Sequence, residues 1–171
     1  RLQHGRQGRL KLSPGAVALA AIVRAIHAEP NHWPIGRTMF QKLAYFATQA
    51  GIPTGLTFRQ ESYGPFSPDL NRLRGRLEDN GVLTETASSG GRMLVVTPGP
   101  EFEAARRAYD SYLAQWRDVL ERVVDLFLRL NTREAEIAAS VHFATAQLAS
   151  RRQDPPSEWE VWRYIEHWKH D

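Results

Sequence analysis

The chain has 171 residues, of which 42% are hydrophobic and 24% are charged, and its formal net charge is +3. These values describe an ordinary soluble globular protein with one main domain. The chain has no cysteine, which excludes disulfides and thiol chemistry, and no apolar run approaches the roughly 18 residues of a membrane span. We therefore expect a cytoplasmic protein with no membrane partner.

The positive charge is concentrated at the start of the chain. Arg1, Arg6, Arg9 and Lys11 precede the first expected helix, and without them 18 basic residues stand against 19 acidic ones. Attraction to phosphate depends on clustered charge, so the net charge alone does not predict nucleic-acid binding. We expect residues 1–12 to be a flexible basic linker and residues 13–171 to form a single domain.

Three helices are predicted in the first half of the domain. Ser13-Pro14 begins the first, and Glu29-Pro30 ends it. The second begins near Thr38, and its apolar positions recur at helical spacing, at Phe40, Leu43, Ala44 and Ala47. After an aromatic loop marked by glycine and proline, Ser67 as N-cap and Pro68 as first helical residue begin the third, which Gly81 ends.

A β-hairpin follows the third helix. Residues 82–86 and 92–97 are rich in β-branched residues and enclose a Ser-Ser-Gly-Gly turn. Helix, helix and hairpin in this order are typical of a winged helix-turn-helix. We expect residues 13–97 to form a winged-helix-like part.

The second half is predicted to be helical. Residues 101–130 carry a helical pattern with a possible break near Tyr112, Asn131-Thr132 caps a further helix, and Ser157 to Glu160 form a capping box for a last one. The predicted fold class is mainly α with a small β-hairpin (α+β), in which a winged-helix-like core is followed by C-terminal helices over residues 98–171.

A known family shares several segments of this chain. Residues 40–46 (Phe-Gln-Lys-Leu-Ala-Tyr-Phe) are followed by Ala50-Gly51, by Leu56-Thr57-Phe58 and by residues 63–70 (Tyr-Gly-Pro-Phe-Ser-Pro-Asp-Leu). This series resembles the SocA-like, or Panacea, antitoxin domains, and within that group the C-terminal toxin-binding domain of DarG antitoxins. The resemblance covers roughly residues 35–145.

The resemblance implies a partner and a function. DarG antitoxins neutralise DarT, a toxin that ADP-ribosylates thymidine in single-stranded DNA. A cognate DarT-like toxin is thus the expected partner, bound 1:1 by a chain that is monomeric alone. Inhibition would occlude the toxin's single-stranded DNA and NAD site, by steric cover or by DNA mimicry. Two alternatives stay open: a winged-helix autoregulator that binds operator DNA, and a SocA-like protease adaptor.

The expected partner-binding residues surround the Tyr-Gly-Pro-Phe turn. Two aromatic residues, Tyr63 and Phe66, flank a rigid turn before a helix, and they either meet a partner or seal the core. Lys42 could pair with Asp69 or Glu61 or meet the partner, but the favoured interpretation is a solvated or snorkelling lysine. Arg72 and Arg76 are expected to face solvent on the third helix, and Trp162 is a candidate interface residue on the last. The full set is Lys42, Arg59, Tyr63, Phe66, Ser67, Asp69, Arg72, Arg76 and Trp162.

Catalytic motifs are not found in the sequence. It contains no Gly-x-Ser-x-Gly elbow, Walker loop or dinucleotide fingerprint. His167 and His170 form one local pair without a third ligand, so no metal site and no cofactor are expected. Full-length DarG antitoxins also carry a macrodomain hydrolase, and nothing in this chain resembles one. We therefore expect that the chain is not an enzyme.

Overall fold

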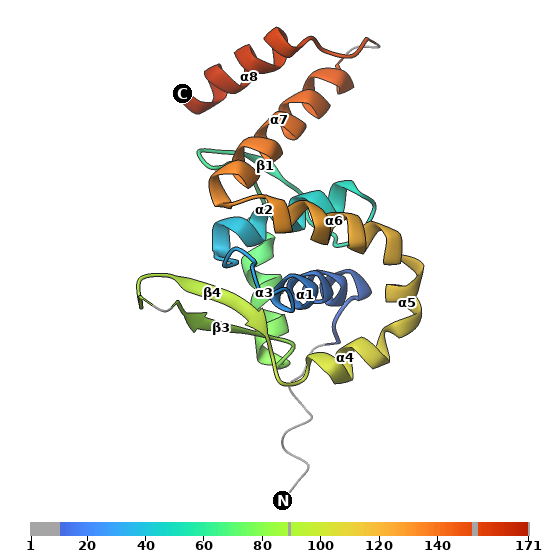
Figure 1. The fold of residues 1–171 in the computed structure, drawn as a ribbon. Helices are drawn as coiled ribbons and strands as arrows, with labels where there is room; N and C mark the ends of the chain where they lie inside the picture. Colours follow the sequence, from blue (N-terminus) through green and yellow to red (C-terminus); the bar gives the residue numbers. More distant parts are fainter. Residues whose placement is uncertain (1–10, 89, 152–153, 171) are drawn as a thin grey trace, which may run out of the picture.

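The computed structural model describes residues 11–88, 90–151 and 154–170. Its order of elements is α1(Pro14–His27), α2(Arg37–Gln49), β1(Arg59–Glu61), β2(Gly64–Phe66), α3(Asp69–Asp79), β3(Leu83–Ala87), β4(Leu94–Pro98), α4(Phe102–Ala108), α5(Asp110–Gln115), α6(Arg117–Arg129), α7(Thr132–Ser150) and α8(Glu158–His170). The predicted class, mainly α with a small β component, is confirmed (Figure 1).

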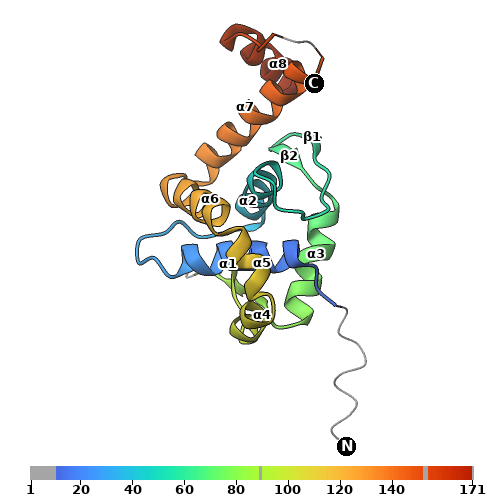
Figure 2. The ribbon, with the colours of Figure 1, turned by 90° about the vertical axis from the view of Figure 1, so that its right-hand side faces the viewer.

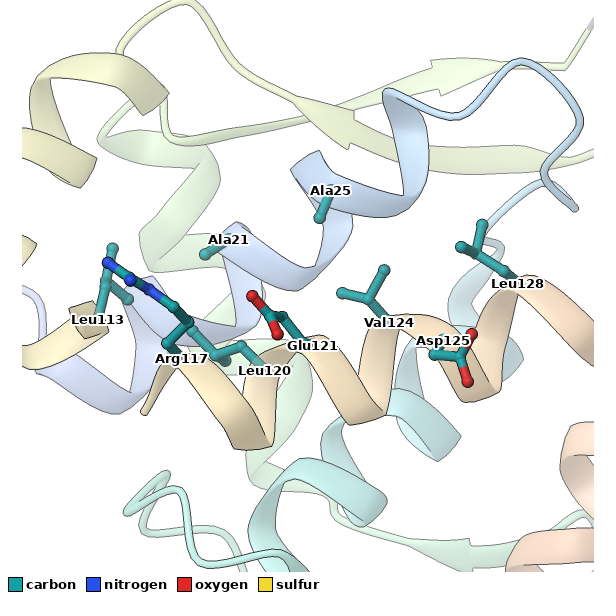
Figure 3. Close-up of a pocket in the computed structure, with 9 residues that line it drawn as sticks. All are labelled: Ala21, Ala25, Leu113, Arg117, Leu120, Glu121, Val124, Asp125 and Leu128. Atoms are coloured by element: carbon teal, nitrogen blue, oxygen red, sulfur yellow. The ribbon is translucent and has the colours of Figure 1, made fainter. Parts of the chain in front are cut away.

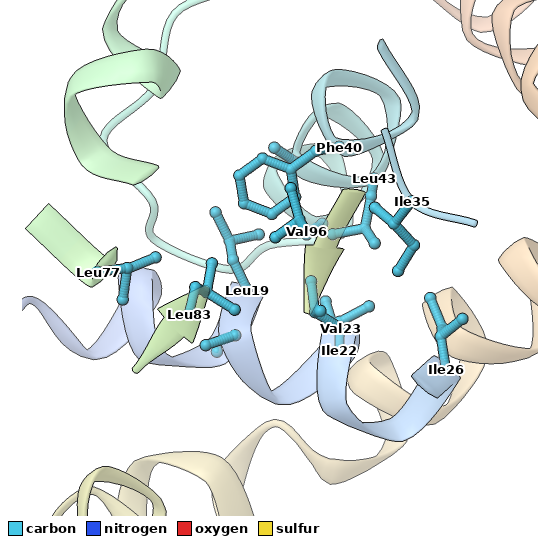
Figure 4. Close-up of a cluster of buried hydrophobic side chains, with 14 of the residues drawn as sticks. Leu19, Ile22, Val23, Ile26, Ile35, Phe40, Leu43, Leu77, Leu83 and Val96 are labelled. Carbon is cyan, nitrogen blue, oxygen red and sulfur yellow. The ribbon is translucent and has the colours of Figure 1, made fainter. Parts of the chain in front are cut away.

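Helix α1 is the centre of the core. The side chain of Ser13 accepts a hydrogen bond from the backbone of Ala16, as predicted for an N-cap. Nearly every residue between Gly15 and Ile26 is buried, because other elements cover α1 on several sides. Figure 4 shows its side chains among those of α2 and strand β4, where the cluster includes Leu19, Ile22, Val23, Ile26, Ile35, Phe40, Leu43, Leu77, Leu83 and Val96.

The winged-helix-like part is formed by α1, α2, α3 and the β3–β4 hairpin. Strands β3 and β4 are antiparallel, with Leu83 opposite Pro98 and Ala87 opposite Leu94. The backbone of Val96 also donates a hydrogen bond to the carbonyl of Ile35, 2.7 Å away, which ties the hairpin to the segment before α2. Both the hairpin and its place after α3 agree with the sequence prediction.

A second small hairpin lies where only a loop is predicted. Strands β1 and β2 are antiparallel, with Arg59 opposite Phe66 and Glu61 opposite Gly64. Three residues per strand are too few to give a period-two pattern, and Pro65 inside β2 argues against a strand. Gly64 adopts φ +103°, a conformation that favours glycine.

The predicted role of Ser67 as an N-cap is wrong. Helix α3 begins at Asp69 after Pro68 and has no side-chain cap. Ser67 is instead fully buried, and its backbone is held on both sides by Gln41, whose side-chain amide donates to the Ser67 carbonyl and accepts from the Ser67 N–H, each at 2.9 Å. A buried glutamine thus fixes the chain before α3.

Helices α4, α5 and α6 follow one another around α1 (Figure 1). The first two are short, with 7 and 6 residues, whereas α6 has 13. The breaks fall at Tyr109 and Trp116 and not at Tyr112, near which the sequence suggests one. At the start of this region the Tyr109 hydroxyl donates to the carbonyl of Leu12, at 2.6 Å. Leu12 is half-buried against the core, while residues 1–10 of the predicted linker lie outside the described residues.

Helices α7 and α8 extend away from α1 and from the helices α4 and α5 around it (Figure 2). The cap predicted at Asn131 is present and is a full capping box with Glu134. At Ser157 the hydroxyl accepts from the Glu160 N–H and donates to the Glu160 carboxylate, each at 3.2 Å, which is the first half of the predicted capping box. Helix α7 packs on α2, and α8 packs on α7 beside the β1–β2 hairpin. Among the described helices, none has the length and apolar character needed to cross a membrane.

Candidate partner-binding site

The β1–β2 hairpin, residues 59–66, presents the predicted aromatic turn, and we call it the Tyr63 hairpin. Tyr63 lies in the turn between the strands and is 69% exposed. Phe66 in β2 is half-buried. An exposed tyrosine on a short, fixed turn can contact a partner with little loss of conformational entropy.

The last helix holds the Tyr63 hairpin from one side. The Tyr164 hydroxyl donates to the Gln60 side chain at 2.8 Å, and the indole N–H of Trp168 donates to the Glu61 carbonyl at 3.0 Å. Lys169 Nζ donates to the carbonyl of Ser62 at 2.9 Å. Three consecutive residues of the hairpin are therefore bonded to α8.

Lys42 is not the solvated lysine that the sequence suggests. It is only 1% exposed, and its Nζ donates to the carbonyl of Pro65 at 3.0 Å. This correction has a physical cause: α2 is covered both by the Tyr63 hairpin and by α7. Gly64 leaves room for the ammonium group, because a Cβ at this position would lie 3.1 Å from Lys42 Nζ and 3.1 Å from Ser140 Oγ.

Burial changes the acid–base behaviour of this lysine. It lowers the pKa of Lys42 from 10.5 to about 8, and the positive charge of Lys169 acts in the same direction. The carboxylate of Glu136 opposes the change without cancelling it. Within the described part of the chain no carboxylate forms an ion pair with Lys42, because Glu136 is paired with Lys169 at 2.9 Å. A buried ammonium group normally has such a partner.

A pocket of about 190 Å³ opens beside Lys42 and the turn, and we call it the Lys42 pocket. It is lined by Arg37, Thr38, Gln41, Lys42, Tyr63, Phe66 and Asn71. Two of these residues are cationic and none is acidic. The structure thus brings together Lys42, Tyr63 and Phe66 from the predicted set, with Ser67 buried next to them.

The predicted basic residues of α3 lie outside the pocket. Arg72 and Arg76 are exposed, as expected, and Arg72 is paired with Asp69 at 3.2 Å. Arg59 in β1 is paired with Glu61 at 2.8 Å. These ion pairs reduce the positive field that a DNA-binding helix would need.

An ion-pair network that the sequence does not reveal joins α2, α3 and β3. Glu85 accepts two hydrogen bonds from the guanidinium of Arg37, at 2.9 and 2.8 Å, and lies 3.6 Å from Arg74. Arg74 is buried and also lies 3.2 Å from Glu78. The bonds from Arg37 hold the pKa of Glu85 below its usual range, whereas burial raises the pKa of Glu78.

An aromatic cluster packs between α2 and α7. The Tyr45 hydroxyl lies 2.7 Å from Nδ1 of His142, and its ring packs edge-on against Phe46 and Phe58. Burial raises the pKa of Tyr45 and lowers the pKa of His142.

Trp162 belongs to a different surface. A groove of about 410 Å³, which we call the α7–α8 groove, is lined by Val141, Thr145, Pro156, Glu158, Val161, Trp162 and Ile165. Trp162 is 57% exposed there, and Trp159 on the same helix is 61% exposed. Large exposed aromatic side chains are typical of binding surfaces. The structure therefore separates Trp162 from the Lys42 pocket.

A further apolar hollow of about 300 Å³ lies between α1 and α6. Ala21 and Ala25 of α1 face the side chains of Leu120 and Val124 on α6 (Figure 3). The small alanine side chains leave this space unfilled. None of the predicted site residues lines it.

Two comparisons with known proteins bear on this arrangement. No protein-family model matches the chain. Over 142 residues the chain is 29% identical to a DNA ADP-ribosyl glycohydrolase of Thermus aquaticus. The match covers 82% of this chain and 38% of that protein, so the chain spans well under half the length of this relative.

This similarity corrects one expectation. The sequence interpretation holds that the chain is not an enzyme, whereas most of the chain aligns with a protein named for a hydrolase activity. That expectation is therefore wrong as stated. Its source was the absence of familiar catalytic motifs, and such motifs do not represent every hydrolase.

Proposed function

We propose that this chain is the toxin-binding part of an antitoxin that neutralises a DarT-like DNA ADP-ribosyltransferase. In this proposal the chain is monomeric alone, binds the toxin 1:1 and covers its single-stranded DNA and NAD site. The observation that carries the proposal is the Lys42 pocket, where an exposed Tyr63 and a buried cation meet on a hairpin held by α8.

Two further observations support it. The relative from Thermus aquaticus is named for removing ADP-ribose from DNA, the modification that DarT-like toxins add. In addition, the Trp162 side of the α7–α8 groove offers a second apolar surface. Contacts at both places would give an interface with central aromatic anchors, as tight protein complexes have.

The operator-binding alternative has less support. Phosphate contacts require unpaired basic side chains on the recognition helix, yet Arg72 is paired with Asp69 and Arg74 is buried with Glu78. Steric cover is also favoured over DNA mimicry, since the lining of the Lys42 pocket is cationic and not acidic.

The test is a calorimetric titration of the chain against a catalytically inactive DarT-like toxin, repeated with a single-stranded oligonucleotide already bound. Nanomolar 1:1 binding that the oligonucleotide weakens supports the proposal. Absence of binding to the toxin, together with salt-sensitive binding to an operator duplex, refutes it. Because of the relative's name, the chain is also assayed for release of ADP-ribose from modified DNA.

A further inference from the structure

We infer that the Lys42 pocket receives a carboxylate side chain, Asp or Glu, from the protein partner. The inference rests on the proposed function, because it names the group that the toxin would place in this site. It concerns the chemistry of one contact and not the toxin's identity.

The geometry of the buried ammonium group favours an anion. Lys42 has three N–H donors, and the carbonyl of Pro65 accepts one of them at 3.0 Å. The pocket offers further neutral donors from Thr38 and Asn71, and no acidic residue lines it. The carboxylate that acts on Lys42, Glu136, is paired with Lys169 at 2.9 Å, and no described carboxylate forms an ion pair with Lys42 itself. An incoming carboxylate would therefore add a direct ion pair that the free chain lacks.

A protein carboxylate fits better than a nucleic-acid phosphate. A single strand is bound by a positively charged groove that follows several successive phosphates. Three other basic residues near this pocket already have acidic partners: Arg37 pairs with Glu85, Arg59 with Glu61 and Arg72 with Asp69. One isolated cation in a small hollow matches one acidic side chain.

The aromatic residues give this contact its affinity. Tyr63 is largely exposed beside the pocket, and Phe66 contributes to the lining. Their rings would pack on the partner's backbone and side-chain methylene groups and exclude water from the ion pair. Charge pairs shielded in this way contribute more than exposed pairs.

The test follows the protonation of Lys42 in the free chain and in the complex. The charged groups that act on it are Glu136 on α7 and Lys169 on α8, and Arg37 is the other charged residue that lines the pocket. A carboxylate at Nζ raises the pKa of Lys42 from about 8 toward its ordinary value, so complex formation at this pH takes up a fraction of a proton. NMR of the lysine side chains reports this pKa directly, and calorimetry in buffers of different ionisation enthalpy counts the proton.

Variants complete the test. Lys42→Met should weaken toxin binding on the order of 30-fold or more and abolish the proton uptake. Lys11→Met, at an exposed position, is the matched control and should change neither quantity. Tight toxin binding in which the pKa of Lys42 does not change overturns the inference and leaves the proposed function intact. Complete absence of toxin binding by the unmodified chain overturns the proposed function, and the inference with it. The NMR measurement uses the unmodified chain, so it stands even where a variant folds poorly.

Discussion

Replacing Lys42 by methionine should remove a specific pH dependence of stability. Methionine has a similar length and no charge, so it keeps most of the packing against the Tyr63 hairpin. At any one pH its effect combines the lost hydrogen bond to Pro65 with the removed buried charge. The change of stability with pH isolates the charge.

The sign and the size follow from the two pKa values of Lys42. The folded chain releases the proton near pH 8, whereas the unfolded chain keeps it up to about 10.5. Between these values the unfolded state binds more protons, so the free energy of unfolding rises with pH. When the unfolded state binds one proton more than the folded state, the free energy of unfolding rises by about 1.4 kcal/mol per pH unit. Titration is incomplete at both ends of the range, so the total rise between about pH 7.5 and about pH 9.5 is about 2 kcal/mol.

The assay is urea unfolding of both proteins across this range of pH. The window ends below about pH 10, because burial raises the pKa of Tyr45 and that group lowers stability as the unfolded tyrosine ionises. Between about pH 7.5 and about pH 9.5 the free energy of unfolding of the unmodified chain should rise by about 2 kcal/mol relative to that of Lys42→Met. Parallel pH profiles, within about 0.5 kcal/mol, would show that Lys42 is not a buried ammonium group of low pKa.

Other substitutions probe single contacts. Tyr63→Ala should weaken toxin binding by roughly 10- to 100-fold in calorimetry without changing the urea midpoint, because the ring is exposed. Trp168→Phe loses the indole bond to the Glu61 carbonyl and should cost about 1 kcal/mol, with faster amide hydrogen exchange in the Tyr63 hairpin as the decisive signal. Glu85→Gln should lower stability by about 1 to 2 kcal/mol at neutral pH. Since Arg37 lowers the pKa of Glu85, this difference should vanish as the pH falls below about 4.5, and a constant difference would contradict the ion-pair account.

The sequence predicts long elements well because their signals are local. The first helix has its Ser13 cap and the wing hairpin its β-branched strands, and both lie where the sequence places them. Solvent exposure of Arg72 follows from helical periodicity alone. Such features depend on neighbours within a few residues.

The contents of the Lys42 pocket depend on contacts between distant segments. Burial of Lys42 results from the hairpin and α7, which cover a helix position that periodicity assigns to the surface. Ser67 is buried because Gln41, 26 residues earlier, takes both of its backbone groups. Neither pairing has a local sequence signature. The one available signal is that Gln41 and Lys42 are adjacent polar residues in a largely apolar helix, which is consistent with buried polar contacts.

The bonds between α8 and the Tyr63 hairpin have a consequence for the order of events during synthesis. Trp168 and Lys169 follow the hairpin residues that they hold by 107 positions. At about 5 to 20 residues per second, a ribosome needs roughly 5 to 20 seconds to add that length of chain. During this interval the turn with Tyr63 already exists, yet the helix that fixes it does not. A nascent chain therefore acquires its finished binding surface late, well after its hydrophobic core can form.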